Sequence, residues 1–184
     1  MFSLETNAEL IWASRTVKKI LPDNPKILYP ACWMDISLEQ TFPQASVTYL
    51  DPSDTACEAL RVDTSRRVLQ LALPTEQDIG KYNLIVLMNQ NGDFSTLDVA
   101  RHLSERVWYI LALWLSWNFD AERYLFDGRF ELNGVLLSDN NKNTYSLIQK
   151  DIEEYRKIKF YSTDTLKRTQ FFRHADWYLF SPYN

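Results

Sequence analysis

The chain has 184 residues, a formal net charge of −4 and a hydrophobic content of 46%. This balance is typical of a folded globular protein with one core, and it excludes a disordered chain. The small acidic excess gives no overall attraction to nucleic acid or to anionic lipid, so neither is predicted as a partner. The short basic clusters are interpreted as solvated surface: Lys18–Lys19, Arg66–Arg67 and Lys157–Lys159.

Cysteine and histidine are scarce. The sequence has two cysteines, Cys32 and Cys57, which are too few for a disulfide scaffold, and two histidines, which form no zinc pattern with them. A reducing compartment and no metal are therefore predicted. The N-terminus has no basic stretch followed by an apolar signal region, so a cytoplasmic location is expected.

The region up to residue 73 predicts alternating helices and strands. Thr6 and Glu9 have the spacing of a capping box, and apolar residues follow at helical period. Residues 1–25 are thus expected to form an N-terminal helix and linker, packed on a single domain that spans 1–184. The elements expected next are a strand at 26–31, a short helix at 37–42, a strand at 46–50, a helix at 55–61 capped by Asp54, and a strand or helical turn at 66–73.

The second half of the chain continues the alternation. Residues 83–88 are almost all apolar and predict a central strand, whereas the apolar spacing in 97–119 predicts a long buried helix. The apolar run at 107–117 is shorter than the roughly 20 residues of a membrane-spanning helix, so no membrane is predicted. Its aromatic residues predict core packing or, alternatively, a homodimer patch: Trp108, Tyr109, Trp114 and Trp117. The elements expected last are a strand at 132–138, a helix at 145–157, a strand beginning at 159–161, and an antiparallel pair formed by 169–173 and 177–182.

Alternating strands and helices indicate a doubly wound, mostly parallel α/β sheet, and the last pair adds antiparallel strands at the C-terminal end. In such sheets a ligand binds beyond the carboxyl ends of the strands, where the strand order reverses, which is normally after the first strand. The residues to inspect are therefore 29–37, with the sequence YPACWMDIS, and Asp51, which ends the second strand.

This arrangement resembles the class I S-adenosylmethionine-dependent methyltransferases, which have a Rossmann-like sheet. Their first strand is followed by an acidic residue and a glycine-rich turn. Aligned on Cys32, the turn glycines correspond to Ala31, Trp33 and Asp35, and the first acid corresponds to Tyr29. Glycine serves there because the backbone turns tightly and approaches the ligand closely. The resemblance implies that these residues lie beside the cofactor, in a degenerate form of the family's loop.

Two further pieces carry the resemblance. Asp51 matches the acid that holds the cofactor ribose in the family, and residues 132–138 (LNGVLLS) resemble the family's turn into strand five. The main chain of 31–33 would then lie beside the methionine part of the cofactor. An alternative for Asp51 is the turn chemistry of an Asp-Pro pair. The alternative for Trp33 is loop packing, and for Asp35 it is the role of an acid at a helix N-terminus.

The polar residues Asn89, Gln90 and Asn91 follow the fourth strand, where the family places residues that contact the methyl acceptor. The Asn-Pro-Pro-Tyr-like motif of amino methyltransferases is missing, and a polar turn is the alternative interpretation. No serine-hydrolase elbow or phosphate-binding loop occurs. The sequence thus leaves two functions: S-adenosylmethionine-dependent methyl transfer to an acceptor that it does not identify, or a non-catalytic interaction module on the same fold.

Overall fold

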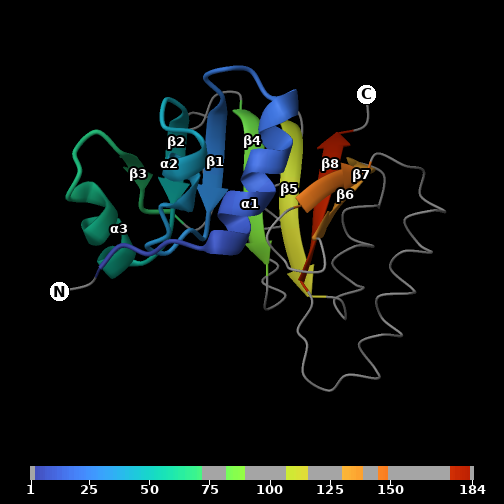
Figure 1. The fold of residues 1–184 in the computed structure, drawn as a ribbon. Coiled ribbons are helices and arrows are strands. Elements are labelled where there is room, and N and C mark those ends of the chain that lie inside the picture. Colours follow the sequence, from blue (N-terminus) through green and yellow to red (C-terminus); the bar gives the residue numbers. More distant parts are fainter. Residues whose placement is uncertain are drawn as a thin grey trace.

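A computed structural model describes residues 3–71, 82–89, 107–115, 130–138, 145–148 and 175–182. Its centre is an eight-stranded sheet with the order β3-β2-β1-β4-β5-β8-β6-β7 (Figure 1). The strands are β1 (Lys26–Pro30), β2 (Ser46–Leu50), β3 (Arg67–Leu69), β4 (Tyr82–Asn89), β5 (Val107–Leu115), β6 (Phe130–Ser138), β7 (Tyr145–Ile148) and β8 (Ala175–Pro182). The helices are α1 (Ala8–Val17), the 3-10 turn η1 (Lys18–Ile20), α2 (Ser37–Thr41) and α3 (Asp54–Arg61).

The sheet is mixed. Strands β3, β2, β1, β4 and β5 run parallel, β8 lies antiparallel between β5 and β6, and β7 is antiparallel to β6. This confirms the predicted doubly wound, mostly parallel α/β sheet with antiparallel strands at its C-terminal side. The chain builds outward from β1 through β2 to β3 and then returns to the other side of β1 with β4. The strand order therefore reverses between β1 and β4, which is the ligand-binding position of such sheets.

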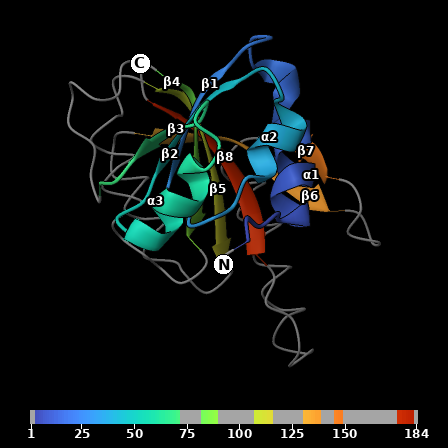
Figure 2. The same ribbon diagram turned by 90° about the vertical axis from the view of Figure 1, so that its left-hand side faces the viewer.

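Both faces of the sheet are buried. Successive side chains of a strand point to opposite faces. In β4, Leu84 and Val86 belong to the hydrophobic cluster that includes Leu10 of α1 and Leu38 of α2, and both helices lie on the same side of the sheet (Figure 2). The intervening residue Ile85 is also fully buried. Burial on two faces explains why this strand is apolar at almost every position.

The two helix caps differ from prediction by one residue. Asn7, not Thr6, caps α1: its Oδ1 accepts from the backbone N–H of Glu9 at 3.0 Å and of Leu10 at 3.1 Å. Ser53, not Asp54, caps α3, because its Oγ accepts from the N–H of Ala56 at 3.3 Å. Asn and Ser are among the residues most favoured at an N-cap, which accounts for both shifts by one residue.

The predicted long helix over 97–119 is wrong where the structure describes it. Residues 107–115 form β5, which is paired on both sides, with β4 and with β8. A strand paired on both sides lies inside the sheet and can be apolar at nearly every residue, so helical spacing can be read into it by chance. Tyr109 packs against the hydrophobic cluster. Trp108 and Trp114 are therefore strand residues, and Trp117 lies outside the described residues.

In the described part of the chain, no helix has the length and apolar character to cross a membrane.

The C-terminal elements also differ from prediction. Residues 145–148, expected to begin a helix, form β7. Residues 132–138 form a strand, as predicted from their apolar run, although the resemblance had suggested a turn there. They are part of β6, whose register with β8 shifts between Leu132 and Gly134. Residues 177–182 are a strand, as predicted, but they pair with β5 and β6. Their expected partner at 169–173, and the strand start at 159–161, lie outside the described residues.

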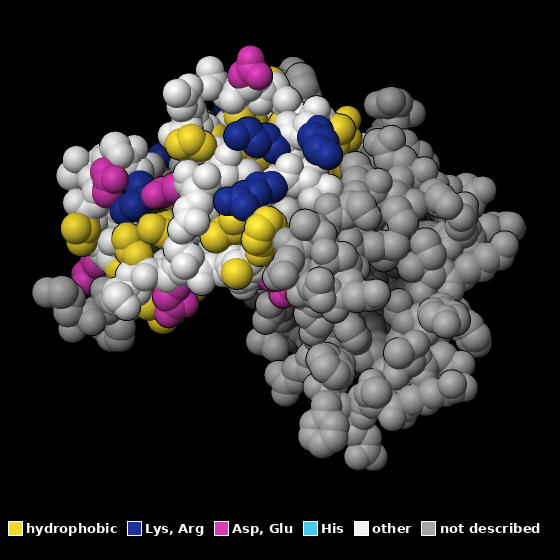
Figure 3. All heavy atoms as spheres, in the orientation of Figure 1, with side chains coloured by type: hydrophobic (Ala, Val, Ile, Leu, Met, Phe, Trp, Pro, Cys, Tyr) yellow, Lys and Arg dark blue, Asp and Glu magenta, His cyan; other side chains and the backbone are white. Residues whose placement is uncertain are grey.

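The basic residues over α1 have local partners. In Figure 3 dark blue Lys and Arg side chains gather over this helix. The Lys18 ammonium donates to the Thr41 carbonyl at 3.0 Å, and the Arg15 guanidinium lies 4.9 Å from the Trp12 ring centroid. Arg66, expected to be solvated, instead forms a half-buried ion pair with Glu39. Residues 157–159 lie outside the described part.

Candidate functional site

The carboxyl ends of β1 and β2 lie side by side. The strands are parallel and in register, so that Pro30 pairs with Leu50, and Ala31 and Asp51 follow at the same edge of the sheet. The Cys32 N–H donates to the Leu50 carbonyl at 3.4 Å, which continues the ladder past the strand end. The structure thus brings together the two segments that the sequence singled out, 29–37 and Asp51.

The turn after β1 keeps a glycine-like backbone without glycine. Ala31 has φ 50° and Trp33 has φ 52°, and they are the two non-glycine residues with positive φ in the described part of the chain. This left-handed conformation costs about 1–2 kcal/mol for a residue with a Cβ atom, and it is a clear outlier for a bulky residue. Both positions are among those aligned with the glycines of the methyltransferase turn. The turn therefore has a positive φ, which glycine favours, at two positions where the resemblance expects glycine.

The Asp51 carboxylate holds this turn in place. Its Oδ2 accepts the backbone N–H of Trp33 at 2.8 Å, and its Oδ1 accepts the N–H of Ser53 at 2.9 Å. The residue is buried, with 6% of its surface exposed. Because a carboxylate oxygen has two lone pairs, each oxygen retains one further acceptor position. Asp51 thus fixes the ends of β1 and β2 relative to each other and can still accept two hydrogen bonds.

Side chains alternate between inside and outside along the turn. Cys32 and Met34 are buried, whereas Ala31 and Trp33 face solvent. The Trp33 residue is 44% exposed, although indole is one of the largest apolar side chains. It is therefore not packed into the turn, and the turn presents Ala31 and Trp33 to solvent.

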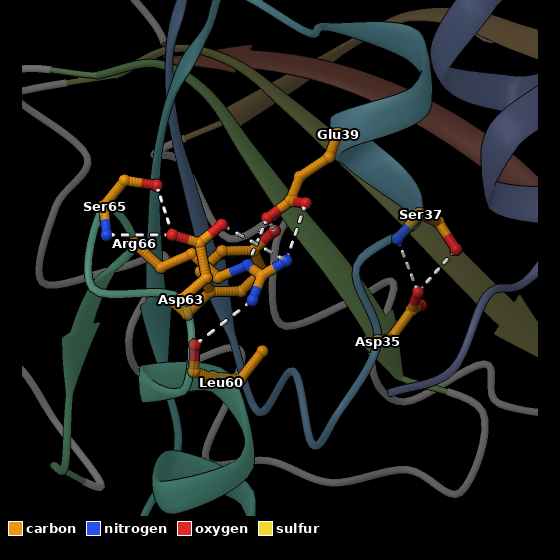
Figure 4. Close-up of polar contacts among 8 residues, drawn as sticks. Asp35, Ser37, Glu39, Leu60, Asp63, Ser65 and Arg66 are labelled. Carbon is orange, nitrogen blue, oxygen red and sulfur yellow. Dashed lines mark hydrogen bonds and ion pairs between the residues drawn. The ribbon is translucent and has the colours of Figure 1, made fainter. Parts of the chain in front are cut away.

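A second carboxylate lies behind the turn. Tyr29 stands where the resemblance expects the first acid, and its hydroxyl donates to Asp35 Oδ2 at 2.7 Å. Asp35 Oδ1 accepts from the N–H of Ser37 at 2.8 Å and from its Oγ at 2.5 Å (Figure 4). Burial, and then the Asp35 carboxylate, raises the pKa of Tyr29 well above its usual value, so the phenol stays protonated as a donor. Asp35 also sits at the start of α2, which agrees with its alternative interpretation as an acid at a helix N-terminus.

The segment before α1 crosses the turn, a contact that the sequence did not predict. The Glu5 N–H donates to the Met34 carbonyl at 2.8 Å, and the Ile36 N–H donates back to the Glu5 carbonyl at 3.0 Å. The Asn7 N–H donates to Ser37 Oγ at 2.5 Å. Backbone pairing of this kind depends on the fold and not on residue type, so no sequence signal could have revealed it. The turn is fastened on one side by Asp51 and on the other by the N-terminal segment.

Burial disfavours the thiolate form of both cysteines near the turn. Burial raises the pKa of Cys32 far above its usual value, and the nearby Asp51 carboxylate raises it further. Burial also raises the pKa of Cys57, whose Sγ donates to the Asp51 carbonyl at 3.3 Å. A thiol that stays protonated is a poor nucleophile and a poor metal ligand. In the residues described, no group of His, Cys, Asp or Glu side chains is arranged to hold a metal ion.

The remaining predicted residues are only partly placed. Asn89 is the last residue of β4, at the edge of the sheet where β1 also ends. Gln90 and Asn91 lie outside the described residues. Of the three residues predicted to face the methyl acceptor, the structure therefore places only the backbone of Asn89.

A second polar cluster ties the layers together away from the turn. Arg66 donates to Glu39 through Nε at 2.6 Å and through a terminal nitrogen at 3.1 Å, and it donates to the Leu60 carbonyl at 3.3 Å (Figure 4). The Tyr49 hydroxyl donates to the same Glu39 carboxylate at 2.8 Å. The cluster joins α2, β2 and the connection between α3 and β3, so we interpret it as structural.

Comparison with known proteins identifies the fold. No protein-family model and no curated protein matches the sequence. Among solved structures, the chain is similar to a TehB-like SAM-dependent methyltransferase from Corynebacterium glutamicum (TM-score 0.62, 12% identity, covering 93% of this chain and 87% of that one). It is also similar to a ribosomal protein L11 methylase from Lactobacillus delbrueckii subsp. bulgaricus (TM-score 0.61, 12% identity, 94% and 78%). A third similar structure is an rRNA methylase from Streptococcus thermophilus (TM-score 0.58, 8% identity, 94% and 95%).

At these identities the likeness concerns the fold alone. The neighbours cover nearly the whole chain and share the methyltransferase architecture. The strand order, the position of the turn after β1 and the solved structures agree: the chain has the fold of the class I S-adenosylmethionine-dependent methyltransferases.

Proposed function

We propose that this chain binds S-adenosylmethionine, or a closely related adenosyl compound, at the turn after β1 and serves methyl transfer to an acceptor. The observation that carries the proposal is the left-handed backbone of Ala31 and Trp33. Strained conformations persist where the surrounding structure enforces them, and they are concentrated at functional sites. Here the strain lies at the strand end where this fold binds its ligands.

The residues at hand suit such a ligand. The main chain of 31–33 would lie beside the methionine part, and the two free acceptor positions of Asp51 suit a pair of ribose hydroxyls. Tyr29 and Asp35 would support the turn from behind, and Asn89, Gln90 and Asn91 would lie on the acceptor side. The bound cofactor supplies the reactive methyl group, while the protein orients the acceptor toward it.

The second candidate function is a non-catalytic interaction module. One observation favours it: both Asp51 oxygens already accept backbone N–H groups, so a structural role alone accounts for this carboxylate. Fold by itself does not establish activity. The two candidates differ in whether an adenosyl ligand binds.

Three broader proposals accompany this function. We propose a single domain spanning 1–184, in line with the packing of α1 on α2 and on the hydrophobic cluster. The two free, buried cysteines support a reducing, cytoplasmic location. A homodimer is also proposed. The helix expected to carry its aromatic patch is not formed at 107–115, so the test is direct: sedimentation at rising protein concentration.

A thermal-shift titration tests ligand binding. We expect S-adenosylmethionine and S-adenosylhomocysteine each to raise the melting temperature, since a ligand at 100 times its dissociation constant adds about 2.7 kcal/mol. D51A removes the carboxylate and frees the Trp33 N–H, so the affinity should fall at least tenfold. Each variant is compared with its own ligand-free melting temperature, because the mutation also lowers stability by about 1–3 kcal/mol.

The matched control is D63A. Asp63 is an exposed carboxylate that accepts from Ser65, beyond the end of α3. Its removal should leave the ligand-induced shift unchanged. No shift of the wild-type chain at millimolar ligand would reject the proposed binding and leave the interaction module as the function.

A further inference from the structure

The Trp33 side chain is in an unusual position for so large an apolar group. Its left-handed backbone is bonded to the Asp51 carboxylate, and the residue is 44% exposed just past the end of β1. The described part of the chain has one other exposed large apolar residue, Val62, just past α3. Val62 has an ordinary right-handed backbone, with φ −54°. Trp33 therefore combines exposure with strain, and core packing explains neither.

From these features we infer that the Trp33 indole binds the sulfonium group of S-adenosylmethionine through a cation–π contact, and that it sets a preference for this cation over the neutral thioether product. The inference rests on the proposed function and names a specificity-determining residue within that site. An indole has the most favourable ring face for a cation among the aromatic side chains. The turn has carboxylates on both sides, Asp35 and Asp51, and their negative charge adds to the attraction for a cation.

The order of groups along the ligand points to the sulfonium rather than to the adenine. In S-adenosylmethionine the base and the sulfur are attached at opposite ends of the ribose. With the ribose on Asp51, at the end of β2, one end of the ligand extends toward β3 and the other toward β1. Trp33 follows β1 in the chain, and the methionine part is proposed to lie on the β1 side. We therefore assign its exposed side chain to the sulfur end of the ligand.

Calorimetric titration with both ligands tests this inference, because S-adenosylmethionine and S-adenosylhomocysteine differ only by the methyl group and charge on sulfur. We expect W33L to bind S-adenosylmethionine about fivefold more weakly, as the loss of a partly exposed cation–π contact implies, and to bind S-adenosylhomocysteine within twofold of wild type. W33F keeps a smaller ring and should lie between. If W33L does not fold, W33G replaces it, since glycine removes the ring and relieves the left-handed strain.

The outcomes separate the two proposals. Wild-type binding of both ligands with no change in W33L would overturn the role of Trp33 alone. Equal loss of both ligands in W33L would also overturn it, because the ring would then contact a part that the two ligands share. Absence of wild-type binding to either ligand would instead overturn the proposed function itself.

Discussion

At the residue scale, the turn after β1 shows how one carboxylate can stabilise a conformation that its neighbours disfavour. Ala31 and Trp33 both adopt left-handed φ values that suit glycine. Asp51 accepts the Trp33 N–H at 2.8 Å, and the Asp35 N–H donates to the Cys32 carbonyl at 3.1 Å. The strain is therefore local to the turn, and its cost is met by bonds from the next strand and from within the turn.

Replacing Ala31 with glycine tests this strain. Glycine removes the Cβ penalty of the left-handed conformation but loses more entropy on folding, so we expect A31G to stabilise the chain by about 0.5–1 kcal/mol. The free energy of unfolding in urea measures the change. The control is A59G in the interior of α3, which should destabilise by about 1 kcal/mol. Destabilisation by A31G as large as that of A59G would contradict the assigned backbone.

The sequence predicted which residues meet in this turn, but not their conformation. Alignment on Cys32 placed Ala31 and Trp33 where glycines are usual, and register across β1 and β2 brought Asp51 to the same edge. Alanine and tryptophan both disfavour positive φ, so the left-handed backbone at these two positions could not be predicted from the residue types. The bond from Tyr29 to Asp35 was missed because it depends on the path of the turn, whereas the sequence interpretation treated each residue separately.

At the element scale, α2, β2 and the connection into β3 are joined by the Glu39 carboxylate. It accepts from the Tyr49 hydroxyl and from two nitrogens of Arg66. The Arg66 side chain is 11% exposed and that of Glu39 is 34% exposed. Glu39 raises the pKa of Arg66, while burial, followed by the bond to Glu39, raises that of Tyr49. Both shifts favour the protonated forms of the guanidinium and the phenol, which are the forms that donate to Glu39.

Removal of Glu39 should loosen these elements. E39A removes the carboxylate that accepts from the Tyr49 hydroxyl and from two nitrogens of Arg66, so we expect a loss of about 1–3 kcal/mol in urea unfolding. The change removes nothing from the turn after β1, and ligand-induced shifts should therefore persist. E58A, which removes an exposed glutamate on α3, is the matched control and should stay within about 0.5 kcal/mol of wild type. An E39A chain as stable as E58A would show that the cluster is incidental.

Strands and helices were predicted with unequal success. The first helix and the strands at 26–30 and 46–50 followed from proline punctuation and β-branched runs, and the structure confirms them. The β5 strand was mistaken for a helix because its nearly continuous apolar run lacks the alternation that marks a half-buried strand. The helix expected over 145–157 was wrong at 145–148, where pairing with β6 determines the strand β7. Local pattern thus failed where pairing partners decide the structure.

At the scale of the whole molecule, the strand order positions the candidate site. The order reverses between β1 and β4, so that the turn after β1, the Asp51 carboxylate and the end of β4 lie at one edge of the sheet. This architecture could be predicted, because the connections between parallel strands are nearly always right-handed and only a few arrangements of alternating strands and helices satisfy this rule. The pairing of β8 between β5 and β6 could not be predicted, because it joins segments far apart in the sequence.

Backbone amide NMR spectra during a titration with S-adenosylmethionine test the central claim most directly. The account predicts saturable shifts that are largest at Ala31, Cys32 and Trp33 and at the residues around Asp51, where the strained turn would meet the ligand. Amides of β7, the edge strand farthest from β1 and β2 in the sheet order, should move little. Unchanged spectra at millimolar ligand, or shifts that leave the turn after β1 unaffected, would contradict the account.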